Sequence, residues 1–253
     1  MKLPGPTVRI HGYVYSHIGS AGANRLLRGI KIDLSEWDGT KWDPRGTQYS
    51  REQCSCARHG ASCTCTQGTH CAEGAGNCGF YDFGNFNLNG AASRNFRFTV
   101  SLIGRDSGGT DRIEVRDASV AGNLIVTRNF EYTYVACETA NHDLIIGNTV
   151  EPGDVGHVYD GANVYFHCWR EFGFFRGEFA HTQGGNPHPV VIAYVHHAST
   201  ECAGYDLHYV AAACTDQDRV MHEYSHSIQW QVYGNAWPDD GFCDCGAACG
   251  CVN

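Results

Sequence analysis

The chain has 253 residues, 42% of them hydrophobic and 18% charged, and its formal net charge is −9. This composition is ordinary for one large folded domain or two small ones. The negative charge argues against nucleic acid as a partner, because such binding needs a basic face. No apolar run reaches the roughly 18 residues of a membrane span, and no signal peptide is visible at the start.

The sequence from Val8 to about Tyr132 predicts β-strands. Runs such as VRIHGYVYS, LLRGIKIDLSEW, NFRFTVSLIG and DRIEVRD have strand length and are separated by Gly-rich turns. The segment WDGTKWDPRGT is typical of a turn. Many short strands at close spacing favour a β-sandwich, which we place at residues 1–135.

After residue 135, helix and strand signals alternate, which predicts a second domain at residues 136–253. Apolar or aromatic side chains at steps of three and four mark one face of a helix, namely Val158, Ala162, Tyr165, Trp169 and Phe172. PVVIAYVHH predicts a buried strand, and YDLHYVA predicts another. The predicted fold class is therefore α+β.

Cysteine is the strongest signal in the composition, with 14 residues. Six lie in a segment at 54–78, which we interpret as a loop inserted into the sandwich, and four lie in the C-terminal tail. Dense cysteine among Gly, Ser and Thr predicts disulfide-stapled loops in an oxidising, extracellular compartment. A thiolate metal cluster is the alternative, although C-x-C spacing is less typical of zinc sites than C-x2-C. The candidate disulfide residues are Cys54, Cys56, Cys63, Cys65, Cys71, Cys78, Cys137, Cys168, Cys202, Cys214, Cys243, Cys245, Cys249 and Cys251.

The stretch TDQDRVMHEYSHSIQW contains His-Glu-x-x-His. Thr215 can cap a helix that we predict over residues 216–233, with Val220, Tyr224 and Ile228 packing it into a core. On such a helix His222 and His226 share a face and can bind one zinc ion, Zn2+. Glu223 can then act as general base on a metal-bound water. The alternative is a pair of ordinary helix histidines.

DRVMHEYSHSIQW resembles the active-site helix of zincin metallopeptidases, especially gluzincins of the thermolysin and fungalysin kind. The strands before it, VRIHGYVYS and LLRGIKIDLSEW, resemble transthyretin-like (Ig-like) or carboxypeptidase-regulatory-like β-sandwich domains. The resemblance implies a short zincin-like α/β domain after a sandwich.

The resemblance also implies a third zinc ligand. Asp240, in DDGFCD, stands where the family has a Glu, although its side chain is one methylene shorter and its spacing from His226 is shorter. Asp239, Asp244 and Cys243 are alternatives. Family chemistry further implies an oxyanion donor, for which the candidates are Tyr205, His208 and Tyr233.

Two functions of different class follow. The first is an extracellular zinc-dependent metallopeptidase, or a descendant of one, with a peptide or protein substrate. The second is a catalytically inactive, zincin-derived structural protein, a disulfide-stapled module of an extracellular fibre, wall or surface layer. Such a module could self-assemble through β-sheet edges.

Overall fold

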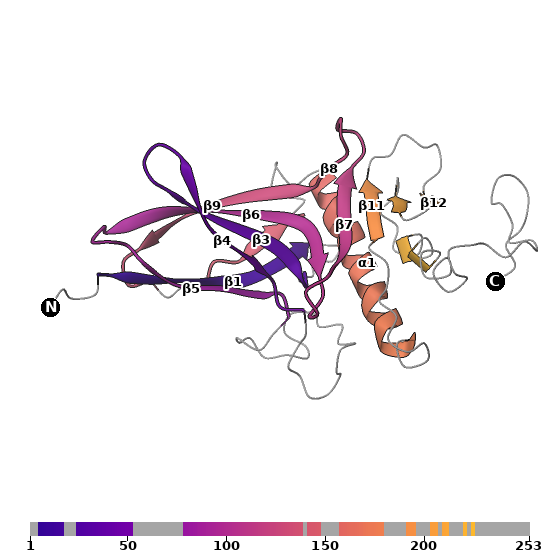
Figure 1. Cartoon of the computed structure of the whole chain (residues 1–253), viewed down its shortest axis with the longest axis horizontal. Helices are drawn as coiled ribbons and strands as arrows, with labels where there is room; N and C mark the ends of the chain where they lie inside the picture. Colours follow the sequence, from indigo (N-terminus) through magenta and orange to yellow (C-terminus); the bar gives the residue numbers. More distant parts are fainter. Residues whose placement is uncertain are drawn as a thin grey trace, which may run out of the picture.

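The structure is a computed structural model of the 253-residue chain. It describes residues 5–17, 24–52, 78–138, 141–147, 157–179, 191–195, 203–206, 209–212, 220–221 and 224–225. Within these residues strands dominate and one long helix is present (Figure 1). The strands are β1 (Thr7–His17), β2 (Asn24–Leu26), β3 (Ile30–Trp37), β4 (Trp42–Tyr49), β5 (Phe80–Asn87), β6 (Ser93–Arg105), β7 (Asp111–Asp117), β8 (Leu124–Ile125), β9 (Thr127–Val135), β10 (Leu144–Ile146), β11 (Val191–Val195), β12 (Ala203–Asp206) and β13 (Tyr209–Ala212); the helix is α1 (His157–Phe179).

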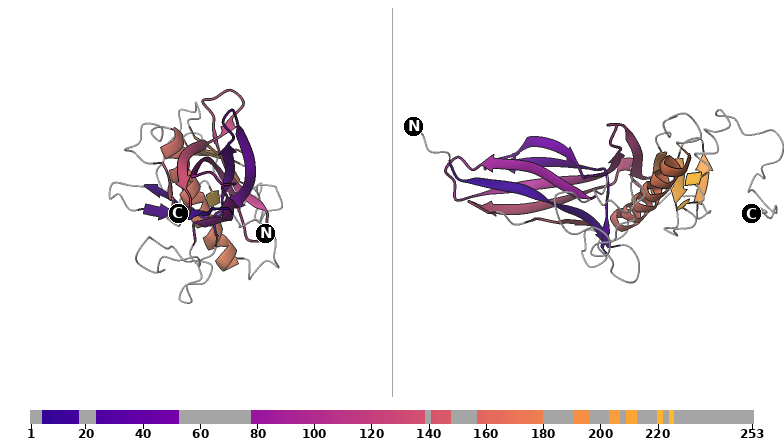
Figure 2. Two further views of the ribbon diagram at one scale, coloured as in Figure 1. Left: turned by 90° about the vertical axis from the view of Figure 1, so that its left-hand side faces the viewer. Right: turned by 90° about the horizontal axis from the view of Figure 1, so that it is seen from below.

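The described strands form two sheets. The smaller has the order β10-β1-β2, with β5 also paired to β1. The larger has nine strands in the order β12-β13-β11-β7-β6-β3-β4, with β8 paired to β7 and β9 paired to β6. Figure 2 shows an elongated molecule in which the long strands lie at one end and α1 with β11 at the other.

Side-chain alternation explains why the long strands form a layered structure. In β3, Ile30, Ile32 and Leu34 are buried, whereas the residues between them are partly exposed. Aromatic rings fill the space behind the sheet, and Tyr81 meets Phe98 edge-on with ring centroids 5.7 Å apart. Apolar burial of this kind on one face of each sheet is the main stabilising contribution.

The prediction of a turn at WDGTKWDPRGT is wrong for its second half, because Trp42–Tyr49 is strand β4. The turn itself is shorter. The Asp38 carboxylate accepts hydrogen bonds from the backbone N–H groups of Thr40 (2.7 Å) and Lys41 (2.8 Å). The cross-strand pair of Trp37 and Trp42, with ring centroids 5.2 Å apart, then starts the hairpin.

The helix α1 packs on the nine-stranded sheet, against β7 and β11. All five residues of the predicted helix face are buried: Val158, Ala162, Tyr165, Trp169 and Phe172. The helix approaches the sheet closely at Gly104, where an added Cβ would lie 2.7 Å from the Trp169 ring. The prediction of this helix face is therefore confirmed.

The larger sheet contains strands from both sides of residue 135. β7 pairs in parallel with β11, with Ile113 opposite Val191 and Asp117 opposite Val195. The described fold is thus rich in β-sheet and contains a helix, which agrees with the α+β prediction as far as the types of element are concerned. The finer division into a sandwich at 1–135 and a second domain at 136–253 stays a prediction.

Candidate functional site

The His-Glu-x-x-His motif lies on a segment of which four residues are described. Val220, Met221, Tyr224 and Ser225 are helical, and Val220 and Tyr224 are fully buried in the main core. The Ser225 hydroxyl donates a hydrogen bond to the Met221 carbonyl at 2.9 Å, which is a bond across one helical turn. The structure thus confirms the predicted helical conformation and core packing at these positions.

Most of the candidate site residues lie outside the described residues. These are His208, His222, Glu223, His226, Tyr233 and Asp240, together with Ile228 and the alternatives Asp239, Cys243 and Asp244. Tyr205 is described in backbone only. It lies in β12, opposite Val210 of β13. Within the described residues, no group of three or more His, Cys, Asp or Glu side chains is arranged to hold a metal ion.

Tyr224, inside the motif, lies in a buried environment that contains polar groups. Burial raises the pKa of its hydroxyl well above the usual value, and the nearby Cys168 and Glu171 raise it further, whereas Arg112 opposes them. These neighbours come from α1 and β7. The motif helix therefore packs where α1 meets the sheet.

A stripe of buried polar side chains runs along α1 toward this place. Asn163, His167 and Glu171 are spaced four residues apart, so they share one face of the helix. Burial is the largest cause that raises the pKa of Glu171, and Arg170 only partly offsets it. No hydrogen bond to the Glu171 carboxylate is found in the described part of the chain.

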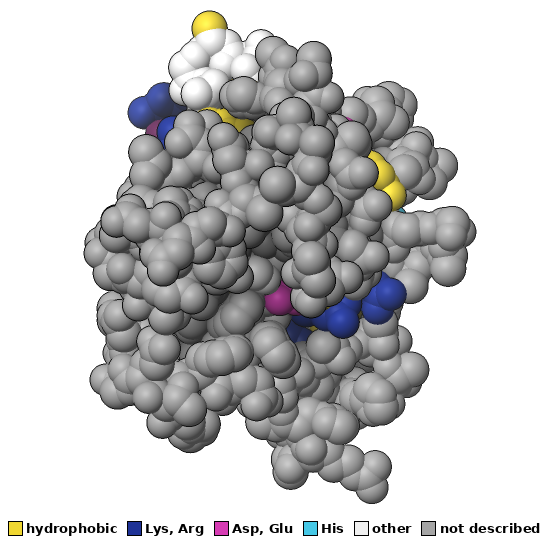
Figure 3. Space-filling view, turned by 90° about the vertical axis from the view of Figure 1, so that its right-hand side faces the viewer, with side chains coloured by type: hydrophobic (Ala, Val, Ile, Leu, Met, Phe, Trp, Pro, Cys, Tyr) yellow, Lys and Arg dark blue, Asp and Glu magenta, His cyan; other side chains and the backbone are white. Residues whose placement is uncertain are grey.

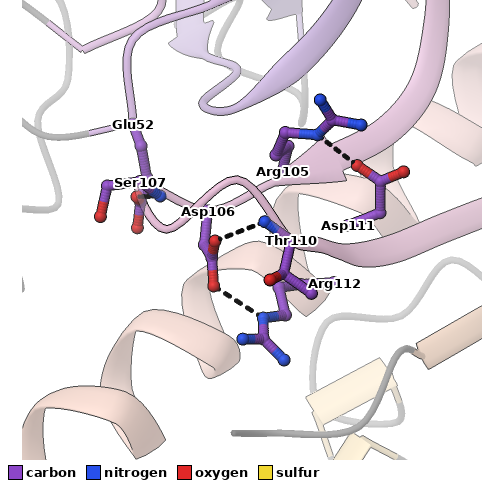
Figure 4. A network of polar contacts seen from close by, with 7 residues as sticks. All are labelled: Glu52, Arg105, Asp106, Ser107, Thr110, Asp111 and Arg112. Carbon is purple, nitrogen blue, oxygen red and sulfur yellow. Dashed lines mark hydrogen bonds and ion pairs between the residues drawn. The ribbon is translucent and has the colours of Figure 1, made fainter.

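Arg112, the charged neighbour of Tyr224 on the sheet side, is held in place by the turn between β6 and β7 (Figure 4). Its guanidinium Nε donates to Asp106 Oδ2 at 2.7 Å, and the two side chains are 12% and 9% exposed. Asp106 Oδ1 also accepts the Thr110 backbone N–H at 2.9 Å. Burial raises the pKa of Asp106, but the bonds from Thr110 and Arg112 outweigh it and the net pKa is lowered.

The same turn contacts the residue that precedes the Cys-rich segment. The Ser107 backbone N–H donates to the Glu52 carboxylate, and Figure 4 shows the two residues next to each other. On the other side of the turn, Arg105 pairs with Asp111 at 2.6 Å. The view of Figure 3, onto the end of the molecule that carries α1 and the last strands, likewise shows basic and acidic side chains next to each other.

The described cysteines differ in state. Cys78 is disulfide-bonded, whereas Cys137 and Cys168 are free. The prediction of disulfides is thus wrong for Cys137 and Cys168. Cys168 lies inside α1, fully buried in the apolar core, and burial raises the pKa of its thiol strongly. Cys137 follows β9 and is exposed. The other candidate disulfide residues lie outside the described residues.

Sequence reasoning missed the surroundings of Tyr224. The available signals were Glu171, placed within the predicted helix, and the turn DSGGT between two strands. Neither signal indicates that the two segments meet.

Of the described helices, none has the length and apolar character needed to cross a membrane.

Comparisons with known proteins assign no family. No protein-family model matches the chain, and no curated protein matches it. Among solved structures, a 9R-lipoxygenase from Cyanothece PCC8801 matches with 10% sequence identity and a TM-score of 0.25, over 71% of this chain and 25% of that chain. The chain thus spans a quarter of the lipoxygenase, and a likeness this weak carries no argument about fold or activity.

The family resemblance read from the sequence is therefore wrong. A zincin peptidase domain preceded by a transthyretin-like domain should match a family model. Instead no model matches, and the described chain is mostly strands with one long helix. A five-residue motif on a helix can arise in unrelated folds, so the chain is not assigned to a family.

Proposed function

We propose that the chain is an extracellular zinc-dependent hydrolase that cleaves peptide bonds. His222 and His226 bind the metal, Asp240 is the third ligand, and Glu223 is the general base. The roles of the two histidines and Glu223 rest on the motif itself and not on membership of a family, whereas Asp240 is one of the carboxylates that follow the motif in the sequence.

One observation carries the proposal: Val220 and Tyr224 are helical and fully buried. Successive residues of a helix are about 100° apart, so positions 222 and 226 would fall on the side opposite residues 220 and 224. The core-facing side chains and the two imidazoles would then not compete for the same space. A helix with its histidines in the core would have argued against a metal site.

The donor set also fits zinc chemically. Two imidazoles and a carboxylate are common ligands of catalytic zinc, which lowers the pKa of a bound water to about 7. Glu223 is one residue from His222, and its carboxylate can take a proton from such a water and deliver it to the leaving amine. Tyr205, His208 and Tyr233 remain the candidates for stabilising the oxyanion.

Metal content and hydrolysis together test the proposal. We expect about one zinc per chain in protein purified without chelator or added metal. Glu223→Gln should keep the zinc and lose cleavage of a casein substrate, whereas His222→Ala should lose both. Ser225→Ala is the matched control, because among the described residues its hydroxyl bonds the backbone carbonyl of Met221.

Two results would overturn the proposal: wild-type protein without zinc, or undiminished cleavage by Glu223→Gln. Absence of both zinc and cleavage would favour the second function, an inactive structural module. In that case the described sheet edges, such as the exposed strand β4, become the surfaces to test for self-assembly.

A further inference from the structure

The side of the nine-stranded sheet that faces away from the sandwich core carries rows of polar side chains. We call this surface, on β4, β3, β6 and β9, the outer face. One row crosses all four strands, because Thr47 pairs with Asp33, Asp33 with Thr99, and Thr99 with Asn129. Neighbouring strands are about 4.8 Å apart, so the row presents hydrogen-bonding groups at that repeat.

Two asparagines of the outer face have side-chain NH2 groups that can donate hydrogen bonds to a ligand. The Thr99 hydroxyl donates to the amide oxygen of Asn129 at 2.7 Å, and Thr133 donates likewise to Asn95 at 2.7 Å. Both asparagines are exposed. Within the described residues no partner is found for their side-chain NH2 groups, which are therefore available to a ligand with hydroxyl acceptors.

Two tryptophans stand at one end of the same face. Trp37 and Trp42 are partly exposed and adjacent, with ring centroids 5.2 Å apart. The Arg97 guanidinium lies 4.2 Å from the Trp42 ring centroid and covers one face of that ring, so a ligand can stack only on its other face and on Trp37. Aromatic faces beside hydrogen-bonding groups suit a ligand that has both C–H faces and hydroxyl edges.

The charges of the outer face cancel locally. Arg97 pairs with Glu131 at 2.7 Å, and Lys31 pairs with Asp33 at 3.0 Å. No uncompensated field is left to attract a nucleic acid or a strongly charged protein. The occupant that fits this surface is therefore neutral, polar and extended.

We propose that the outer face binds a neutral polysaccharide, whose pyranose rings stack on Trp37 and Trp42 and whose hydroxyls bond the polar rows. The strand spacing is comparable to the length of one pyranose unit, so successive sugars meet successive strands. This inference is independent of the zinc site.

Binding of the full chain to cellulose, chitin and xylan tests the proposal, first by depletion from suspensions and then by titration with cellohexaose and chitohexaose. We expect the wild type to bind at least one of these glycans, with quenching of tryptophan fluorescence. Trp42→Ala should weaken binding at least tenfold, and Asn129→Ala should weaken it several-fold. Leu124→Ala removes an exposed apolar side chain on β8 and should leave binding unchanged.

Because Trp42 also supports the hairpin, Trp42→Phe serves as a second variant that keeps an aromatic ring and should retain part of the affinity. The proposal is overturned if the wild type binds none of the glycans, or if Trp42→Ala and Asn129→Ala bind as the wild type does. It is also overturned if sedimentation shows self-association that the same substitutions remove, because the occupant is then a second copy of the chain.

Discussion

Two glutamates of equal burial show how the two ends of the large sheet differ. Glu36 on β3 and Glu171 on α1 are each 7% exposed. Glu36 is paired with two arginines, Arg94 at 2.6 Å and Arg45 at 2.8 Å. Glu171 has no hydrogen bond in the described part of the chain, and its pKa is raised by burial. Within the described residues, the buried carboxylate on β3 is thus paired, whereas the buried carboxylate on α1 beside the motif helix is not.

Buried, unpaired titratable groups lower stability, so chains keep them mostly where function requires them. The contrast therefore separates a buried ion pair that stabilises β3 from a buried carboxylate beside the motif helix. Four substitutions of a carboxylate by its amide test this contrast, because each removes charge while it keeps size.

Glu36→Gln should have the largest effect. The substitution leaves Arg94 and Arg45 without their shared partner, and we expect a loss of about 2 to 3 kcal/mol in the free energy of unfolding. Urea denaturation at pH 7 measures this loss. A change of only a few tenths of a kcal/mol would show that water replaces the carboxylate and that the stability of this part of the sheet does not depend on the pair.

Asp106→Asn should cost about 1 to 2 kcal/mol at pH 7, because bonds to a charged acceptor from Arg112 and Thr110 are weakened. The folded-state pKa of Asp106 is lowered, so the charge contributes stability above its unfolded value of about 4, and this contribution is lost as pH falls through the folded value. Denaturation at pH 7 and pH 3 should show the difference between variant and wild type shrinking on acidification. A difference that stays constant with pH would contradict the assignment.

Glu171→Gln should change the free energy of unfolding in the opposite direction and stabilise the protein. The raised folded-state pKa means that the folded protein binds a proton more tightly than the unfolded chain, so stability falls as pH rises from about 4. The variant should therefore be more stable than the wild type at pH 7, by about 0.5 to 1 kcal/mol, because the neighbouring Arg170 offsets part of the cost of burial. The gain should vanish at pH 3. A destabilised variant at pH 7 would mean that the Glu171 charge has a favourable partner.

Glu131→Gln should have the smallest effect. Its side chain is 54% exposed, and that of its partner Arg97 is 32% exposed. Such surface pairs contribute less than about 1 kcal/mol, and high salt reduces them further. Thermal unfolding at low and high salt checks this, and a loss as large as that of Glu36→Gln would contradict the burial argument.

The local sequence pattern predicted those elements in which buried residues recur at a regular spacing. The face of α1 obeys the helical period from Val158 to Phe172, and the alternation in β3 places Ile30, Ile32 and Leu34 inside. β4 was missed because Asp43, Pro44 and Gly46 are typical of turns. Its strand conformation depends on pairing with β3, which tertiary context supplies.

The candidate site likewise has one part that the sequence predicted and one part that it did not. Burial of Val220 and Tyr224 follows from helical spacing and was predicted. The proximity of Tyr224 to Arg112 and Glu171 depends on the packing of α1 against β7, which joins segments far apart in the sequence. No local pattern encodes that packing.

The Cys-rich segment leaves and re-enters the fold at one place. The Arg51 backbone N–H donates to the Phe80 carbonyl at 2.7 Å, and Gly79 donates to the Arg51 carbonyl at 2.8 Å. The two ends of the segment are thus joined by the scaffold itself. The entropy of closing a loop between them grows only slowly with its length, so the strand pairing at this point can close loops of very different length.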